Sequence, residues 1–240
     1  MTGTLTICST KKLKSSVIRL LKKNGLEVFL AELITVTYKS DEETQSRVRA
    51  VNGPIAVTSR HGVKGIVKNL DSNLSGATEL FCLSGETQKA ALKLNVPIRA
   101  TASKSSLLAG EVVKAGIKSI TYFCADNHRP ELPQILSEKG IRVPKVIVYS
   151  TALNSMKLDR PFDFLLFFSP RSVEAFVQAN LLDAHVVCFC IGETTAKVLQ
   201  ERTSNLIVTA DSPSQEHLDN FIHECNKLTA KVPRREDLCG

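Results

Sequence analysis

Two turns in the C-terminal half of the chain carry small and hydroxyl-bearing residues that could bind an anion. Ser169 and Pro170 follow the apolar run FDFLLFF, and Gly192, Thr194 and Thr195 follow the apolar run VVCFCI. Each turn precedes an amphipathic segment of the kind that forms a helix. A helix N-terminus presents free backbone N–H groups and the positive end of the helix dipole. We therefore expect both turns to attract a carboxylate or a phosphate.

The same succession of apolar run, hydroxyl turn and helix occurs earlier in the chain. In GPIAVTSRHGVKGI, residues 53–66, Ser59 stands where Ser169 stands in the later copy, and the Gly-Glu-Thr of residues 85–87 matches that of residues 192–194. The spacing between the copies is far above the roughly 20–50 residues of solenoid repeats, so it indicates two similar domains. The alternative is that any two strand–helix–strand units look alike.

The elements that must position these turns follow from the hydrophobic pattern. Apolar runs without strict alternation are typical of strands buried on both faces, and here they alternate with amphipathic segments along the chain. This predicts an α/β fold of two similar domains, each a parallel sheet flanked by helices. The expected strands are residues 5–8, 28–36, 55–58, 80–83, a short one at 98, 119–124, 145–151, 164–168, 186–191 and 206–209. The expected helices are residues 15–23, 62–70, 86–94, 103–115, 130–139, 171–178, 193–201 and 214–228.

Residues 37–52 are polar and give no clear strand signal, which predicts that they carry the chain from one domain into the next. The expected domains are a discontinuous first domain of residues 1–36 and 151–240, and an inserted second domain of residues 37–150. Two strands near residues 34–36 and 146–148 would join them as a two-stranded hinge. Because a cleft between hinged domains is a common ligand site, we expect the active site in that interdomain cleft.

Composition sets further limits. Hydrophobic residues make up 43% of the 240 residues and the mean hydropathy is near zero, as in globular proteins. No apolar run reaches the ~20 residues of a membrane span and no signal peptide is evident, so we expect a cytoplasmic protein without membrane contact. The 7 cysteines are odd in number and mostly lie in expected strands, which indicates reduced core residues. The lack of a CxxC motif or a close His/Cys cluster predicts no metal site.

The formal net charge of +7 indicates an acidic partner. A nucleic-acid-binding protein would gather its basic residues on one recognition helix, whereas here they are scattered among amphipathic helices. A nucleotide-dependent dehydrogenase is also disfavoured, because no GxGxxG follows the first strand. Charge alone does not choose among nucleic acid, a membrane surface and a polyanionic small molecule, and a non-catalytic two-domain cleft protein that binds a polyanion is an alternative to an enzyme.

The chain resembles the uroporphyrinogen-III synthases of haem biosynthesis over nearly its whole length. The resemblance depends on the order and spacing of several short motifs. They are Thr58-Ser59 with Gly62-Val63, Tyr149 with Thr151, Phe168-Ser169-Pro170 with Val173 and Phe176, Ile191-Gly192 with Thr194-Thr195-Ala196, and Ala210-Asp211-Ser212-Pro213-Ser214. The chain departs from the family at Lys11-Lys12, where an Arg is common, and at Cys124-Ala125-Asp126, where a Pro-Arg-Gly-like loop is common.

The resemblance implies a lyase that closes the linear tetrapyrrole hydroxymethylbilane to uroporphyrinogen III with inversion of ring D, through azafulvene and spiro intermediates. It implies no metal or organic cofactor, a monomer, and a substrate that the preceding enzyme of the pathway can hand over. Helix N-termini and short hydroxyls suit the carboxylates of such a substrate. No nucleic acid or membrane partner is expected.

Combining the resemblance with the pattern, we assign Tyr149 as the catalytic proton donor to the leaving hydroxyl, with hinge packing as its alternative role. The expected substrate-binding residues are Ser59, Arg60, Ser84, Thr101, Ser103, Ser169, Pro170, Ser172, Gly192, Thr194 and Thr195.

Several of these residues have a simpler interpretation. Ser59, Ser84 and Ser169 are expected to cap helices whether or not they bind substrate, and Ser103 can cap the helix at 103–115. Thr194 and Thr195 can stabilise a first helical turn, and basic side chains such as Arg60 more often lie on a solvated face. A nucleophile pair of Ser59 and His61 is disfavoured, because no orienting acid is evident.

Overall fold

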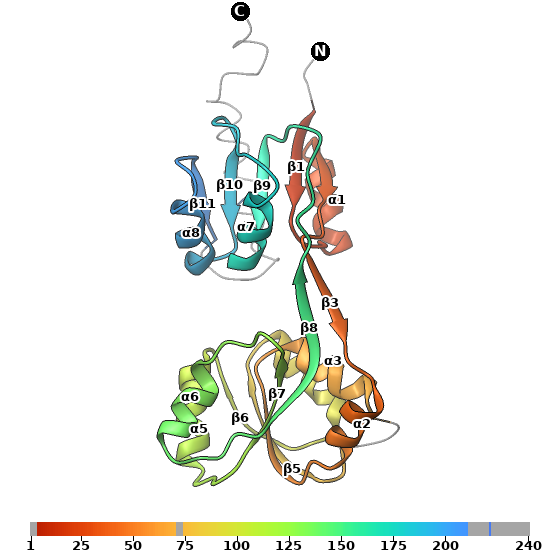
Figure 1. The fold of residues 1–240 in the computed structure, drawn as a ribbon. Coiled ribbons are helices and arrows are strands. Elements are labelled where there is room, and N and C mark those ends of the chain that lie inside the picture. Colours follow the sequence, from red (N-terminus) through yellow and green to blue (C-terminus); the bar gives the residue numbers. More distant parts are fainter. Residues whose placement is uncertain (1–3, 71–73, 211–220, 222–240) are drawn as a thin grey trace, which may run out of the picture. The chain divides into compact units, whose positions relative to one another are not determined.

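The structure of the protein is a computed structural model that describes residues 4–70, 74–210 and residue 221. The chain divides into two compact units (Figure 1). Unit 1 comprises residues 1–35 and 152–240, and unit 2 comprises residues 36–151. That these units are the two domains expected from the sequence stays a prediction. The expected helix at 214–228 and most of the motif at 210–214 lie outside the described residues.

Unit 1 is a five-stranded sheet with helices on both faces. Its strand order is β11-β10-β9-β1-β2, and all of these pairs are parallel. Helix α1 covers one face, and α7 and α8 cover the other (Figure 1). The strands are β1 (Leu5–Ser9), β2 (Leu26–Leu30), β9 (Phe164–Phe167), β10 (Val187–Cys190) and β11 (Ile207–Thr209). The helices are α1 (Ser15–Lys23), α7 (Pro170–Val177) and α8 (Glu193–Gln200).

Unit 2 is a six-stranded sheet of order β3-β8-β7-β4-β5-β6 with helices on both faces. The pairs from β8 to β6 are parallel, and β3 runs in the opposite direction to β8 (Figure 1). Helices α2, α3 and α4 cover one face, and α5 and α6 cover the other. The strands are β3 (Ile34–Tyr38), β4 (Gly53–Val57), β5 (Ala77–Leu83), β6 (Ile98–Ala102), β7 (Thr121–Ala125) and β8 (Lys145–Leu153). The helices are α2 (Glu42–Arg49), α3 (Arg60–Lys68), α4 (Glu86–Ala91) with the short 3₁₀ helix η1 (Leu92–Leu94), α5 (Ser105–Lys114) and α6 (Glu131–Glu138).

The two sheets repeat one pattern of neighbours. When β9 is matched with β4, the order β11-β10-β9-β1-β2 corresponds strand by strand to β6-β5-β4-β7-β8. The match joins the strands that precede Ser169 and Ser59, as the sequence repeat requires. The unit 1 strands that match β7 and β8 are the N-terminal strands β1 and β2. Unit 1 is therefore a circular permutation of the unit 2 arrangement, which favours a duplication over a chance likeness of strand–helix units.

The prediction of an α/β fold with parallel sheets is confirmed, but one helix was not foreseen and one expected strand is divided in two. The polar segment 37–52 contains helix α2, in which only Thr44 and Val48 are buried. So few buried positions leave no helical periodicity of apolar residues in the sequence. The clearest sequence signal for this helix is its N-cap Asp41, whose carboxylate accepts the Thr44 backbone N–H at 2.9 Å. The expected strand at residues 28–36 is divided into β2 and β3. Residues 31–33 separate the two strands, and β3 belongs to the other sheet.

The core explains why the strands read as unbroken apolar runs. In unit 2, Val57 and Phe123 pack toward α3, whereas their neighbours Ala56 and Tyr122 pack toward α5 and α6. Both faces of each central strand are thus removed from water, so successive residues along the strand are all apolar. Among the described residues, Cys8, Cys82, Cys124, Cys188 and Cys190 are free and buried in these strands, as expected.

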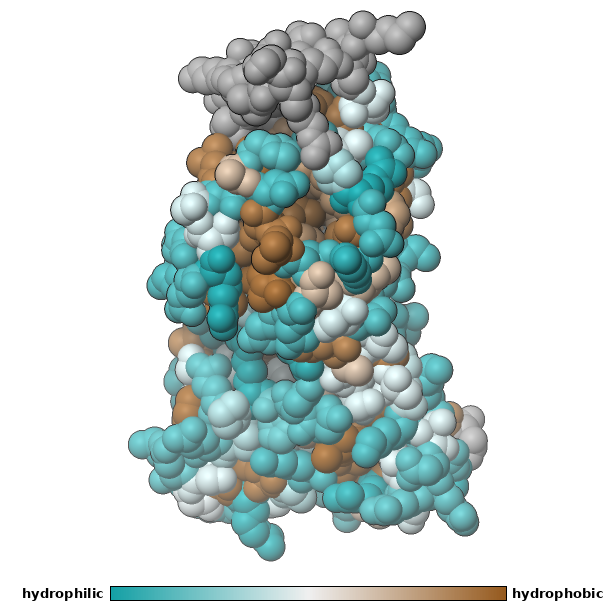
Figure 2. Space-filling model, turned by 45° about the horizontal axis from the view of Figure 1, so that its top comes forward, coloured by the Kyte–Doolittle hydropathy of each residue, from teal (hydrophilic) through white to brown (hydrophobic). Residues whose placement is uncertain are grey.

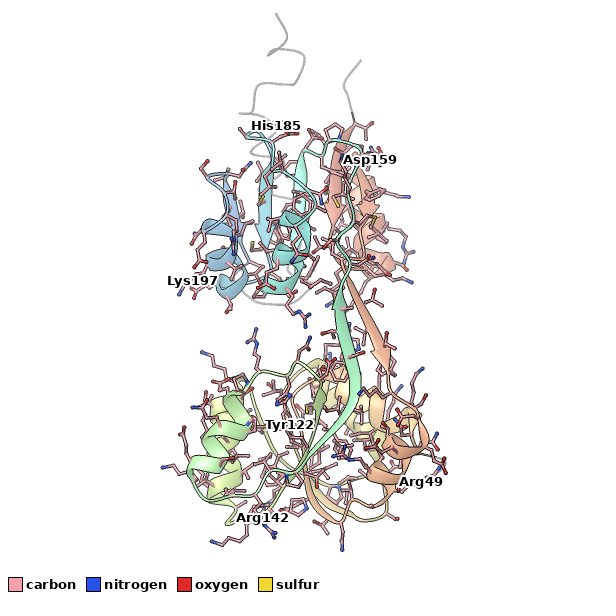
Figure 3. The ribbon with its side chains drawn as sticks, in the orientation of Figure 1. Arg49, Tyr122, Arg142, Asp159, His185 and Lys197 are labelled. Carbon is pink, nitrogen blue, oxygen red and sulfur yellow. The ribbon has the colours of Figure 1, made fainter. Side chains whose placement is uncertain are left out.

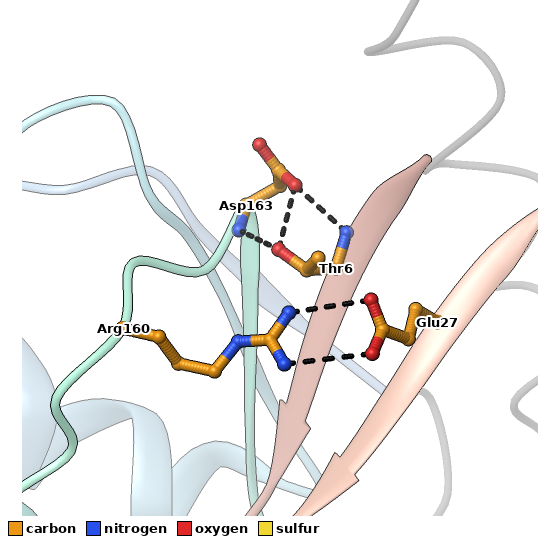
Figure 4. Close-up of polar contacts among 4 residues, drawn as sticks. All are labelled: Thr6, Glu27, Arg160 and Asp163. Carbon is orange, nitrogen blue, oxygen red and sulfur yellow. Dashed lines mark hydrogen bonds and ion pairs between the residues drawn. The ribbon is translucent and has the colours of Figure 1, made fainter. Parts of the chain in front are cut away.

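Polar contacts fasten the amino ends of the unit 1 strands (Figure 4). Asp163, just before β9, accepts hydrogen bonds from the backbone N–H of Thr6 at 2.7 Å and from its hydroxyl at 2.8 Å. Arg160 pairs with Glu27 at 3.2 Å on the exposed rim, where such an ion pair contributes little. The Thr6–Asp163 contacts fix the register of β1 against β9, and so the relative position of the turns at their other ends.

The surface is mostly hydrophilic in the view of Figure 2, with smaller hydrophobic patches between. Arg49, Arg142 and Lys197 are exposed and project outward from three different elements (Figure 3), so the basic residues are not gathered on one helix. Within residues 4–70, 74–210 and 221, no helix is long and apolar enough to cross a membrane.

Helix α3 lies directly on β8 because Gly65 has no side chain. A Cβ at Gly65 would lie 2.7 Å from the Cβ of Val148 and 2.8 Å from its carbonyl oxygen, which is closer than real Cβ atoms come. Backbone of β8 cannot give way as a flexible side chain would. The packing of α3 on β8 therefore requires glycine at this position.

We expect Gly65→Ala to lower the free energy of unfolding by about 1–3 kcal/mol, the usual cost of overpacking. Gly110→Ala in α5 is the matched control, since a Cβ there meets no atom within 4 Å. That variant should gain roughly 0.5–1 kcal/mol from helix propensity. Urea unfolding of both variants checks this, and equal stability of the two would contradict the tight α3–β8 contact.

Candidate functional site

Each sheet has a pair of neighbouring central strands from which the chain continues toward opposite edges of the sheet. In unit 2 this pair is β4 and β7, and in unit 1 it is β9 and β1. Open α/β sheets bind ligands between such strands, outside their carboxyl ends. The turns that follow these strands contain Ser59, Asp126, Ser169 and Lys11, so the topology selects the same edges as the sequence motifs.

Ser59 follows β4 and begins α3 as its N-cap. Its Oγ accepts the backbone N–H of His61 at 3.0 Å, so the expected capping role is confirmed. The Ser59 side chain also lowers the pKa of the Tyr149 phenol, as a hydrogen-bond partner of that group. A serine hydroxyl has one proton and two lone pairs, which is enough to cap the helix and to bond the phenol.

Tyr149 is buried, with 8% of its surface exposed. Burial raises the pKa of its phenol above the ordinary value of 10, and the hydrogen bond from Ser59 acts in the opposite direction, because it stabilises the phenolate. Cys124 and Asp126 raise the pKa further by smaller amounts. The phenol is thus fully protonated at neutral pH, and a partner is in place for the phenolate that forms when it gives up its proton.

A shift of register in β8 directs Tyr149 to this position. Cys124 of β7 pairs with Ile147, but the next residue, Ala125, pairs with Tyr149, so Val148 is an extra residue in β8. Val148 and Tyr149 both pack in the core on the α3 side, which regular alternation would not allow. Bulges that re-aim a side chain are common beside functional sites.

The ring of His61 contacts Tyr38. Its Nδ1 lies 2.8 Å from the hydroxyl of Tyr38 on β3, and the backbone N–H of His61 donates to the Ser59 hydroxyl. The phenol at Nδ1 is not the orienting carboxylate that a nucleophile pair of Ser59 and His61 would use. Arg60 lies half-buried in the same first turn, where its charge lowers the pKa of Tyr38 against the larger effect of burial.

A second group at this edge was missed by the sequence analysis. The hydroxyls of Thr58 and Tyr122 are 2.7 Å apart, and the ring of His128 meets the Tyr122 ring edge-on, with centroids 5.6 Å apart. The Nδ1 of His128 lies 3.0 Å from the carbonyl oxygen of Ala125. A carbonyl only accepts, so Nδ1 carries the proton and Nε2 is the acceptor in the neutral ring. The available signal was a histidine in a polar turn directly after a strand.

The structure places Ser84, Thr101 and Ser103 together at the carboxyl ends of β5 and β6. All three are exposed, and the backbone N–H of Ser84 donates to the carbonyl of Ala102 at 2.9 Å. The expectation that Ser84 and Ser103 cap helices was wrong. The N-cap of α4 is Gly85, whose φ of 75° suits glycine, and α5 begins at Ser105 after Lys104, two residues beyond Ser103.

In unit 1 the Ser169 turn is a complete capping box. Ser169 accepts the backbone N–H of Ser172 at 3.2 Å, and the Ser172 hydroxyl accepts the Ser169 N–H at 3.2 Å and donates to the Ser169 carbonyl at 2.7 Å. Pro170 occupies the first turn, as is favoured there. The hydroxyl of the buried Ser172 thus forms its hydrogen bonds within the capping box, whereas Ser169 is half-buried.

The Gly192 turn follows the neighbouring strand β10. Gly192 is the N-cap of α8 and has no side chain to satisfy the first N–H groups of the helix. Thr194 is exposed in that first turn, and Thr195 is buried. On the other side of β9, the amino group of Lys11 lies 5.7 Å from the ring centre of Phe168, which places a cation beside the Ser169 turn.

No group of three or more His, Cys, Asp or Glu side chains that could hold a metal ion occurs in the part of the chain that the structure describes. The arrangement offers instead a buried phenol with a hydroxyl partner in unit 2, and helix N-termini with exposed hydroxyls at the carboxyl edge of both sheets. These groups can donate one proton and bind several carboxylates. The predicted location of the site in a cleft between the domains stays a prediction.

Comparison with known proteins agrees with this chemistry. The family model described as Uroporphyrinogen-III synthase HemD matches residues 15–219. No curated protein sequence matches the chain.

Two solved structures illustrate the likeness. A mutant uroporphyrinogen III synthase from Thermus thermophilus is 18% identical, with 93% of this chain and 99% of that chain covered and a TM-score of 0.67. Uroporphyrinogen-III synthetase from Helicobacter pylori is 19% identical, with 92% and 99% covered and a TM-score of 0.67. At these identities the likeness establishes a shared fold.

The hydrogen bond between Ser59 and Tyr149 can be tested without substrate. We expect Ser59→Ala to raise the pKa of Tyr149 further, because the phenolate loses its partner, and to cost about 0.5–2 kcal/mol of stability through the lost cap. The chain has 3 tyrosines, so the Cζ signal of Tyr149 can be resolved by NMR. At alkaline pH this signal should move less toward the phenolate position in Ser59→Ala than in the wild type.

Ser169→Ala is the matched control, since it removes the corresponding cap in unit 1. It should cost a similar amount of stability and leave the Tyr149 signal unchanged. An identical response of Tyr149 in the two variants would show that Ser59 has no specific effect on the phenol.

Proposed function

Since the chain belongs to the uroporphyrinogen-III synthase family, we propose that it closes hydroxymethylbilane to uroporphyrinogen III with inversion of ring D. The observation that carries this proposal is the family match over residues 15–219, within which the buried phenol of Tyr149 contacts the ring of His61 beside the N-cap Ser59. The following steps assign roles to this chain's own residues.

Tyr149 is the proposed acid of the first step. It gives its proton to the hydroxymethyl oxygen of ring A, which leaves as water, and the electron pair of the pyrrole nitrogen forms the azafulvene. The phenolate of Tyr149 is then held by Ser59. Attack by the substituted carbon of ring D gives the spiro intermediate, which fragments and recloses in inverted order. The ring system then loses a proton, which the phenolate can accept, so that Tyr149 is protonated again.

The larger task is to select one cyclisation over another. The free bilane closes by itself without inversion, so the protein must hold the substrate in the conformation that leads to the type III isomer. Positioning of this kind can supply roughly 7–11 kcal/mol. We propose that the substrate carboxylates bind at the carboxyl edges of the sheets, through Ser59, Arg60, Ser84, Thr101 and Ser103 in unit 2 and through Ser169, Pro170, Ser172, Gly192, Thr194 and Thr195 in unit 1, where Ser172 acts through the capping box.

The reaction is an elimination of water followed by carbon–carbon bond rearrangement, with no net oxidation. This supports an assignment as a lyase that works without a metal or organic cofactor. We further propose that the protein acts as a monomer in the cytoplasm and that the enzyme that makes the bilane hands it over, because the unprotected bilane cyclises on its own.

Product isomer analysis tests the activity. Wild-type protein incubated with hydroxymethylbilane should give the type III isomer, resolved from type I by chromatography after oxidation to the porphyrins. Tyr149→Phe should lower kcat by about 10²–10⁴, the usual worth of a positioned general acid. A wild type that gives only the type I isomer would contradict the proposal and would favour the alternative of a non-catalytic cleft protein that binds a polyanion.

The carboxylate contacts have their own test. Thr194→Val removes an exposed hydroxyl from the first turn of α8 and should raise KM about tenfold with little change in kcat, because a hydrogen bond to a charged group contributes about 1.5–3 kcal/mol. Thr78→Val is the control, since Thr78 is exposed near the amino end of β5, at the opposite edge of its sheet. An equal change of KM in both variants would argue against a contact at Thr194.

A further inference from the structure

We propose that Tyr38 and His61 form a positioning pair that holds the phenol of Tyr149 against Ser59. The inference rests on the proposed function, because it assigns the pair a role through Tyr149. All four residues belong to unit 2 and come from three separate places in the chain: β3, the N-terminus of α3, which holds both Ser59 and His61, and β8.

The pair is defined by one hydrogen bond. The hydroxyl of Tyr38 lies 2.8 Å from Nδ1 of His61, and the two ring centres are 6.1 Å apart. Whichever of the two atoms donates, the bond fixes the rotation of the imidazole. Tyr38 is itself held, because the amino group of Lys68 lies 4.9 Å from its ring centre.

Both rings of the pair contact Tyr149. The ring centre of His61 is 5.8 Å and that of Tyr38 is 6.5 Å from the ring centre of Tyr149, at interplanar angles of 40° and 46°. Tilted rings at these separations are in favourable aromatic contact. The phenol of Tyr149 therefore has two neighbouring rings that limit its rotation, and one hydroxyl partner in Ser59.

His61 connects these contacts. Its backbone N–H donates to the Ser59 hydroxyl, which lowers the pKa of the Tyr149 phenol, and its side chain is bonded to Tyr38 and contacts the ring of Tyr149. The same residue thus sets both the hydroxyl that Tyr149 bonds and the ring against which Tyr149 packs. A displacement of about 1 Å at a reacting group can cost about 10²-fold in rate, so even a small gain of rotation at Tyr149 is measurable.

The test is a set of double-mutant cycles. Tyr38→Phe removes only the hydroxyl, His61→Phe keeps a ring without an acceptor, and His61→Asn keeps an acceptor near the Nδ1 position without the ring. Tyr38→Phe and His61→Phe should each lower kcat about three- to tenfold, the effect of one lost hydrogen bond, with KM changed less than about twofold.

Coupling distinguishes positioning from an independent effect. The double variant Tyr38→Phe/His61→Phe should be no slower than His61→Phe alone, and both single effects should vanish in a Tyr149→Phe background. His61→Asn should retain part of the dependence on the Tyr38 hydroxyl. Unchanged kcat in Tyr38→Phe, or an equal loss in the Tyr149→Phe background, would overturn the inference.

Val112→Ala controls for stability alone. Val112 is fully buried on α5, in the core on the other face of the sheet from Tyr149. This variant should lower Tm at least as much as Tyr38→Phe and leave kcat unchanged.

NMR relaxation of the Tyr149 ring gives a readout that needs no turnover. The ring should be more ordered in the wild type than in Tyr38→Phe. An inactive wild type with this difference would overturn the proposed function and retain the pair, whereas an active wild type without it would overturn the pair alone.

Discussion

The contact between α3 and β8 is the constraint on which the unit 2 site depends. Gly65 lets the helix lie on Val148 with no intervening side chain. Because α3 is rigid, this contact also fixes its first turn, where Ser59 and His61 lie next to Tyr149. A larger residue at position 65 would lift the helix and separate the capping hydroxyl from the phenol.

The same few groups then serve structure and chemistry together. Ser59 caps α3 and also lowers the pKa of Tyr149, so the stability of the helix start and the acidity of the phenol are linked through one hydroxyl. Burial raises the pKa of Tyr149 and keeps its proton in place, and Ser59 stabilises the state that forms when the proton leaves. A phenol exposed to water would be free to rotate, and a phenol buried without a partner would be a poor acid.

The permuted relation of the two units explains their shared edges and their differences. Matching β9 with β4 brings the Ser169 turn onto the Ser59 turn and the Gly192 turn onto the Gly85 turn. The backbones differ in detail: Gly85 has a φ of 75°, whereas Gly192 is extended at 176°. Only unit 2 carries a tyrosine beside its capping serine, since all 3 tyrosines of the chain lie there. The two units thus offer similar anion-binding turns, but only unit 2 can supply a phenolic acid.

The fold class and most elements could be predicted from the sequence, because strands buried on both faces and amphipathic helices leave distinct local patterns. Helix α1 was predicted at its observed bounds, and the capping of α3 and α7 by Ser59 and Ser169 was read correctly. The prediction missed α2, whose buried residues are too few to show a helical periodicity. It was also wrong at Ser84 and Ser103, because the observed helices begin one or two residues later than expected. Which side chains meet at Tyr149 could not be predicted in this way, because it depends on contacts between distant segments. The direction of the Tyr149 side chain depends on an extra residue in β8. The Tyr38–His61 contact joins two segments that are distant in the sequence and that no local pattern connects.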